Sequence, residues 1–207
     1  SSDLVIPLGE SGAGKTTLVK FLTDSPDADN TESTMNFRAF GKVYQVRKSR
    51  DDGSSTLHDV FVTIADYRGQ NLGTLFRGLM ASAKQGDSEL GFHRINTLIF
   101  VVDLFAPPVD ATGKFEADDV RREMPDEHRI SENVSKWSEE TLEIIFGSLD
   151  HDVLQSICVF INKIDLVSSE KGRARAREAY EPLVERIEKW AQNHPPRILL
   201  GSLKTGE

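Results

Sequence analysis

The sequence of 207 residues has a single cysteine, Cys158, and no apolar run long enough to form a membrane helix. One cysteine excludes an internal disulfide framework and favours a reducing compartment, so we expect a cytoplasmic protein. A membrane helix needs about 20 consecutive apolar residues. The best stretch, residues 97–106, is interrupted by Asp103. The N-terminus, SSDLVIPLGE, also lacks the basic start and long apolar stretch of a secretory signal.

Basic residues are fewer than acidic ones, 25 against 33, which gives a net charge of −8 with neutral histidines. A dedicated binder of duplex nucleic acid normally carries a basic face, so we expect no nucleic-acid partner. The five histidines are scattered without a zinc spacing, which argues against a structural metal site. The composition, 38% hydrophobic and 28% charged, is typical of a soluble globular protein, and the length suits one domain over residues 1–207.

What the chain does contain is a repeated alternation of short apolar or β-branched runs with helical patterns. This alternation predicts an α/β three-layer sandwich, in which a mainly parallel six-stranded sheet has one antiparallel strand and helices on both faces. Two adjacent runs joined by DDGSS predict the antiparallel hairpin. We expect strands at 4–8, 38–47, 57–66, 98–103, 157–162 and 198–201, and helices at 15–23, 71–84, 134–149 and 169–193.

One stretch, about 104–134, interrupts the alternation. It contains two prolines and the charged run FEADDVRREMPDEHR, and it is far longer than the usual connection between elements. Two interpretations stay open for this insertion: a solvated loop, or an element that contacts a partner protein.

An octet directly after the first apolar run matches the phosphate-loop pattern G-x-x-x-x-G-K-[ST] in full. Its glycines let the backbone wrap closely around an anion, where a Cβ would clash. Backbone N–H groups and the start of the following helix then direct partial positive charge at phosphates. We expect Lys15 to bridge the β- and γ-phosphates and the Thr16 hydroxyl to bind Mg²⁺. The expected nucleotide contacts are Gly9, Glu10, Ser11, Gly12, Ala13, Gly14, Lys15, Thr16 and Thr17.

The phosphate loop does not define the base, and the same octet occurs in myosin motors, so ATP stays open. Residues 162–165, N-K-I-D, follow the apolar run SICVFI and resemble the N-K-x-D guanine motif of Ras-like GTPases. The Asp165 carboxylate can accept from guanine N1–H and the 2-amino group, whereas adenine has no 2-amino group and an unprotonated N1. The resemblance implies that Asn162 pairs on the opposite side of the base and that the Lys163 stem packs over the ring. Ser202, Leu203 and Lys204 resemble the S-A-K segment whose backbone contacts guanine O6.

Residues 66–70, D-Y-R-G-Q, resemble the D-x-x-G-Q segment of small GTPases and Gα subunits. The resemblance implies that Asp66 reaches Mg²⁺ through water, Gly69 donates its N–H to the γ-phosphate, and Gln70 orients the attacking water. Asp103 ends the next strand and competes for the metal role. We favour Asp66, because Asp103 is followed by leucine rather than by the glutamate of many ATPases.

In GTPases of this kind a segment before the second strand, the first switch, supplies a threonine to Mg²⁺ and the γ-phosphate. Thr31 and Thr34 are the two candidates for this role. We favour Thr34, because the run S-T-M-N-F at 33–37 is similar to the entry into the second strand of Arf-type GTPases. The predicted catalytic residues are then Gln70, Lys15 and Thr34. The predicted Mg²⁺ ligands are Thr16, Thr34 and Asp66.

Together these segments resemble the Ras-like P-loop GTPase superfamily, with its small GTPase, Arf and Gα branches, over essentially the whole chain. The resemblance implies a P-loop NTPase sandwich and a molecular switch that binds GTP or GDP with Mg²⁺, hydrolyses GTP and orders two switch segments. The alternatives are a binding module with negligible hydrolysis and an ATPase or motor domain. Regulatory or effector proteins are the expected partners, at the switches and the insertion.

The chain also departs from this family in several places. Ser11 stands where Ras has glycine, Arg68 replaces a small residue, and no arginine lies a few residues before Thr34 as it does in Gα. The insertion is foreign to the compact members. The family continues into a terminal helix after the last guanine segment, so we expect that helix to be missing here.

Overall fold

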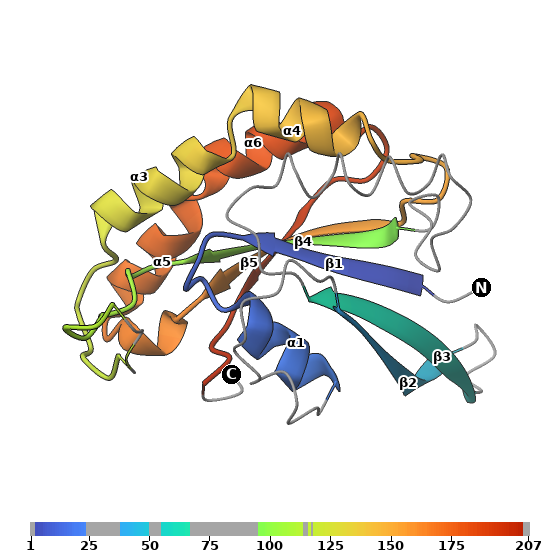
Figure 1. Cartoon of the computed structure of the whole chain (residues 1–207), viewed down its shortest axis with the longest axis horizontal. Helices are drawn as coiled ribbons and strands as arrows, with labels where there is room; N and C mark the ends of the chain where they lie inside the picture. The colour runs from blue at the N-terminus through green and yellow to red at the C-terminus, as the bar shows by residue number, and fades with distance from the viewer. Residues whose placement is uncertain are drawn as a thin grey trace.

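The computed structural model describes residues 3–23, 38–49, 55–66, 95–113, 116 and 118–204. Within these ranges six strands form one sheet in the order β2-β3-β1-β4-β5-β6 (Figure 1). The strands are β1 (Asp3–Gly9), β2 (Arg38–Ser49), β3 (Ser55–Asp66), β4 (Ile95–Asp103), β5 (Ser156–Asn162) and β6 (Arg197–Leu200). The helices are α1 (Lys15–Thr23), α3 (Glu127–Lys136), α4 (Glu139–Phe146), η3 (Ile164–Leu166), α5 (Glu170–Glu178) and α6 (Glu181–Trp190).

The strand pairing confirms the predicted fold class. β1 lies between β3 and β4 and is parallel to both, and the pairs β4–β5 and β5–β6 are parallel as well. β2 and β3 pair in antiparallel register from Arg38 opposite Asp66 to Ser49 opposite Ser55, which confirms the hairpin. Five parallel strands with one antiparallel strand at the edge therefore form the middle layer.

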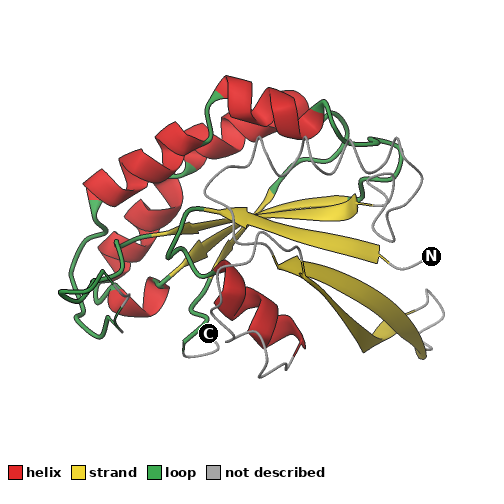
Figure 2. Cartoon of the chain, viewed as in Figure 1, coloured by secondary structure: helices red, strands yellow, loops and turns green. Residues whose placement is uncertain are grey.

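Helices cover both faces of this sheet. α1 packs below it, and α3, α4, α5 and α6 lie above it (Figures 1 and 2). Across the described ranges, no helix is long and apolar enough to cross a membrane. The predicted helix at 71–84 lies outside the described residues.

The larger part of the core lies between the sheet and the four upper helices. Trp137 and Phe146 are buried there against Phe100 of β4. The rings of Phe100 and Trp137 meet edge to face, with centroids 5.0 Å apart and planes at 84°, an arrangement that aromatic pairs favour. On the other face, a small cluster of Ala13, Leu18 and Val101 joins α1 to the sheet.

Two predicted helices are each broken into two. The helix expected at 134–149 begins earlier, as α3, and stops at Trp137. There the Ser138 hydroxyl accepts from the Thr141 N–H and starts α4, since a serine at this position satisfies a donor that the first helical turn leaves open. The helix expected at 169–193 is α5 followed by α6, which begins after Tyr180 with a proline in its first turn. Proline has no N–H for a preceding turn, so α5 cannot run through it.

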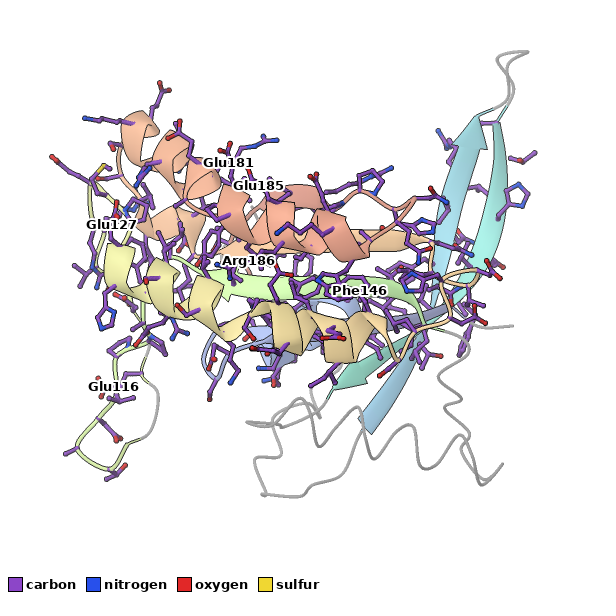
Figure 3. The ribbon with its side chains drawn as sticks, turned by 90° about the horizontal axis from the view of Figure 1, so that it is seen from above. Glu116, Glu127, Phe146, Glu181, Glu185 and Arg186 are labelled. Carbon is purple, nitrogen blue, oxygen red and sulfur yellow. The ribbon has the colours of Figure 1, made fainter. Side chains whose placement is uncertain are left out.

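The upper helices form two rows that lie side by side (Figure 3). Arg186 of α6 reaches across and donates to the carbonyl oxygens of Val134 and Trp137, which end α3 (2.8 and 3.2 Å). A cation at this end of a helix satisfies open carbonyls and opposes the negative end of the helix dipole. Glu139 of α4 accepts from Lys189 and Trp190 of α6. The two rows are therefore joined by polar contacts as well as by the core.

Candidate functional site

The phosphate-loop residues connect the end of β1 to the start of α1. Gly12 and Gly14 have φ values of 78° and 107°, a region that only glycine enters without strain. A Cβ at Gly14 would also lie 2.5 Å from the Asn162 side-chain nitrogen. The Lys15 ammonium donates to the carbonyl oxygens of Gly9 and Glu10, both at 2.8 Å. The loop therefore has the backbone of an anion cradle, with its lysine positioned across it.

Thr16 and Thr17 lie in the first turn of α1, where the helix N–H groups have no partner within the helix. Thr16 is half-buried and Thr17 is exposed. A hydroxyl at this helix start, next to the cradle, has the chemistry of an Mg²⁺ ligand, because this ion takes oxygen donors. Thr16 therefore fits the predicted metal role.

Asn162 joins three separate segments of the chain. Its side-chain nitrogen donates to the carbonyl oxygen of Ala13 in the phosphate loop (3.0 Å). Its side-chain oxygen accepts from the backbone N–H groups of Lys163 (2.8 Å) and Leu203 (3.2 Å). The amide is buried, so these bonds also satisfy polar atoms that water cannot reach. The phosphate loop and both predicted base segments thus meet at one side chain.

The residues after Asn162 turn sharply at Lys163, whose φ is 69°, and enter η3. Asp165 lies in this short helix and is half-buried. Within the described part of the chain its carboxylate has no hydrogen bond or ion pair, so both oxygens can accept from a ligand. Ser202 is buried, and its hydroxyl accepts from the Lys204 N–H (3.2 Å). Lys204 also forms an ion pair with Asp119 of the insertion.

Asp103, the competing metal candidate, is the centre of a buried ionic network instead. It is fully buried, and one carboxylate oxygen accepts from Arg129 of α3 (2.7 Å). The other accepts from the ammonium of Lys163 (2.7 Å), which also donates to the Phe105 carbonyl. Both oxygens of Asp103 are thus paired with cations, and the metal role of Asp66 stays a prediction.

Two further side chains complete this network. The Tyr180 hydroxyl donates to the backbone oxygen of Asp103 (2.6 Å). Asn133 donates to Asp103 and to the Tyr180 oxygen, both at 3.1 Å. Burial raises the pKa of Tyr180 far above its ordinary value, and the Asp103 charge raises it further. Burial lowers the pKa of Arg129, but the hydrogen bond and charge of Asp103 more than offset this, so its pKa is raised. Tyr180 therefore stays neutral and Arg129 stays charged.

Sequence reasoning did not find this network. Arg129 lies in the charged run of the insertion and carries no spacing that links it to Asp103 or Lys163. The available signal was the pair Arg129 and Asn133, four residues apart on one face of a helix, together with an aspartate that ends a buried strand. That signal indicates a contact only once the helix is known to begin at Glu127 rather than at 134.

The insertion packs against the segment that follows N-K-I-D. Arg122 donates its N–H to the Leu166 carbonyl (2.8 Å) and accepts from the Ser168 N–H (2.9 Å), as a short parallel bridge. The Arg122 guanidinium lies 4.5 Å from the Phe105 ring centroid. The Ser169 hydroxyl donates to the Glu123 carbonyl (2.8 Å). The described part of the insertion thus forms ordered contacts beside the predicted base segment.

Several predicted residues lie where the structure does not describe them. Thr31, Thr34, Gly69 and Gln70 lie outside the described residues. Asp66 is the last residue of β3, and only its backbone is described. β3 runs parallel to β1, so the two strands end at the same edge of the sheet. Asp66, the last residue of β3, therefore lies at the edge where the phosphate loop begins. The roles proposed for these residues remain predictions.

No family model matches the sequence, and no curated protein matches it. Among solved structures, the chain is similar to one from the "Signal recognition particle receptor SRb-GTP/SRX complex from Chaetomium thermophilum". The identity is 17% and the TM-score 0.46, over 98% of this chain and 91% of that one. The strand order, and the phosphate-loop motif between β1 and α1, give the chain the α/β three-layer sandwich of P-loop NTPases.

Proposed function

We propose that this chain is a GTP-binding and GTP-hydrolysing molecular switch that uses Mg²⁺. The observation that carries the proposal is the meeting of three loops at Asn162, which bonds to Ala13 on one side and Leu203 on the other. An anion cradle and a base-recognition segment lie next to each other in this arrangement. A nucleotide needs both at the same site.

The phosphate end of the site is built from the loop and the start of α1. Backbone N–H groups of the loop and the Lys15 ammonium bind the β- and γ-phosphates. Thr16 would hold Mg²⁺, with Thr34 as a further ligand and Asp66 reaching the ion through water, and the ion would neutralise charge on the phosphates. Gln70 orients the attacking water, and Gly69 donates to the γ-phosphate. Hydrolysis by the chain alone is slow, because no internal arginine like that of Gα precedes Thr34.

The base end is built from Asp165 and the segment at 202–204. The Asp165 carboxylate, with both oxygens available, accepts from guanine N1–H and the 2-amino group. Adenine offers neither donor, so it leaves a half-buried carboxylate without partners. A site that recognises a ligand by such hydrogen bonds rejects the analogue that lacks them strongly. This favours GTP over ATP and separates the proposal from a motor domain.

Two wider aspects of the proposal follow from the switch function. Regulatory or effector proteins contact the two switch segments and the insertion, since a switch acts only through partners that distinguish its nucleotide states. We also propose a cytoplasmic location, from the single cysteine of the sequence.

The test is a competition of GTP, XTP and ATP for the purified chain and for Asp165→Asn. Asparagine cannot accept from both the N1–H and the 2-amino group of guanine, because its side-chain NH₂ is a donor. In the variant one donor therefore faces another. We expect it to bind GTP roughly 10- to 100-fold more weakly, the cost of a buried unpaired donor. It should gain affinity for XTP, whose carbonyl accepts from the new amide. Asp152→Asn is the matched control, because Asp152 is exposed and precedes β5, whereas the motif lies at the opposite end of that strand.

The guanine assignment fails if Asp165→Asn keeps its GTP affinity and gains none for XTP. Equal competition by ATP on the wild-type chain would favour the ATPase alternative. Single-turnover hydrolysis of bound GTP then separates a switch from a module that binds the nucleotide without cleaving it.

A further inference from the structure

Helix α3 contacts the phosphate loop at two points. The Arg129 guanidinium donates through Nη2 to the carbonyl oxygen of Ser11 (3.3 Å). The Lys136 ammonium lies 3.2 Å from a carboxylate oxygen of Glu10. In a trans peptide the C=O and the following N–H point in opposite directions. The bond to the Ser11 carbonyl therefore fixes the Gly12 N–H on the side away from α3.

The same guanidinium also acts on the base segment. Its Nε donates to one oxygen of Asp103, and the other oxygen of Asp103 accepts from Lys163. Asp103 is fully buried and Arg129 is 8% exposed, so solvent screens this network little. The Asp103 carboxylate thus forms two ion pairs, one with an arginine that contacts the phosphate loop and one with a lysine at the predicted base site.

We infer that Arg129 is a positioning residue that couples the phosphate loop to the base-recognition lysine through Asp103. The inference rests on the proposed function and adds a control of nucleotide affinity to it. Arg129 belongs to the helix that ends the insertion, so a partner protein that displaces α3 loosens the phosphate and base contacts together.

An arginine is needed here because two acceptors lie in different directions. The guanidinium is a rigid fork whose Nε and Nη2 reach Asp103 and Ser11 at the same time, whereas an ammonium is a point charge on a flexible stem. Lysine at this position can neutralise Asp103 but cannot also hold the Ser11 carbonyl. Without any cation there, Lys163 remains as the ionic partner of a fully buried carboxylate, so the position of Lys163 beside the base segment is no longer balanced by Arg129.

The test is a double-mutant cycle on binding of a fluorescent GTP analogue, with Arg129→Gln, Lys163→Met and the double variant. Arg129→Gln should weaken binding roughly 10- to 100-fold, the range for a buried polar group that loses its partner. In the Lys163→Met background the same change should weaken binding several-fold less, because the link from Asp103 to the base segment is already removed. A purely structural role would weaken binding by the same factor in both backgrounds, and that result overturns the inference.

Hydrogen exchange of the nucleotide-free chain gives a readout that does not depend on GTP binding. Arg129→Gln should raise exchange in two segments at once, the phosphate loop at 9–15 and the base segment at 163–168. Arg129→Lys should protect the base segment but not the phosphate loop, and it also carries the test if Arg129→Gln does not fold. Arg175→Gln is the control, because Arg175 is exposed and also pairs with α3, at Glu127 (3.2 Å).

The two measurements separate the two proposals. If the wild-type chain binds no guanine nucleotide, the proposed function fails, and exchange in the nucleotide-free chain still decides the coupling. If GTP binds tightly but Arg129→Gln leaves exchange at 163–168 unchanged, the coupling is wrong and the proposed function stands.

Discussion

Cys158 is the single cysteine of the chain and lies in β5, opposite Arg197 of β6. Its side chain is 8% exposed. Burial raises the pKa of the thiol from 9.0 to about 11, although the Arg197 charge opposes the shift. A buried neutral thiol is a poor nucleophile, because thiolate is the reactive form. Cys158 therefore behaves as a small apolar core residue in the folded chain.

This shift predicts that the folded chain loses stability at high pH. Below pH 9 the thiol is neutral in both states, so it adds no pH dependence. Between pH 9 and about 11 the unfolded chain ionises first, which favours unfolding by about 1 kcal/mol at pH 10. Urea unfolding of the wild type and Cys158→Ala at pH 8 and pH 10 measures this. From pH 8 to pH 10 the free energy of unfolding of the wild type should fall relative to that of Cys158→Ala by this amount. An unchanged difference would show that the thiol is not shielded from water.

At the scale of elements, α5 rests against the insertion through a glycine. A Cβ at Gly172 would lie 2.1 Å from the Glu123 carbonyl oxygen and 2.6 Å from Val167. The Glu123 carbonyl is also held by the Ser169 hydroxyl, which caps the same helix. The helix and the insertion can be this close only because the side chain at 172 is a hydrogen atom.

Gly172→Ala is therefore expected to destabilise the chain, although alanine is the better helix former. On an exposed helical site the change would stabilise by up to about 1 kcal/mol. Here the backbone must move apart, and we expect a net loss of about 1–3 kcal/mol, typical of overpacking. Ala174→Gly on the exposed side of α5 is the control and should cost about 1 kcal/mol from helix propensity alone. Chemical unfolding of both variants decides the matter. Equal or higher stability for Gly172→Ala would contradict the packing described.

The strands could be predicted from the sequence, whereas the breaks within the two long helices were missed. The strands were predicted from runs rich in apolar or β-branched residues, and the bounds differ by three residues at most. Both long helices were predicted as continuous. The first break has only Ser138 as its signal, and serine is also found inside helices. The second has Pro182, a stronger signal, and the break at Tyr180 could have been predicted from it.

At the scale of the whole molecule, some residues of the candidate site could be predicted from the sequence and others could not. Asn162, Asp165 and the phosphate loop belong to contiguous motifs, so their place could be predicted from short stretches of sequence. Arg129 and Asp103 are 26 residues apart, and Lys163 is another 34 residues beyond Arg129. Their contact depends on where α3 begins and on the pairing of β4 with β5. Only the assembled sheet and helix layer bring these charges together.

Binding at this junction should stabilise the entire fold. A ligand that binds only the folded state adds about 2.7 kcal/mol at 100 times its Kd. We expect this gain in the free energy of unfolding with GTP and Mg²⁺, and less with ATP at the same concentration. Lys15→Ala is the control and should show no gain from GTP. Unfolding in urea at several nucleotide concentrations gives the result, and an equal gain in Lys15→Ala would count against the phosphate-loop assignment.

The central position of β1 has a consequence for the growing chain on the ribosome. Leu4 pairs with Thr63 on one side and with Ile95 on the other. Thr63 and Ile95 are therefore synthesised 59 and 91 residues after Leu4. At about 5–20 residues per second, the strand waits roughly 5–20 s for its second partner. During synthesis β1 has two open edges until β3 is made and one until β4 is made, and such unpaired strand edges make a nascent chain prone to aggregate.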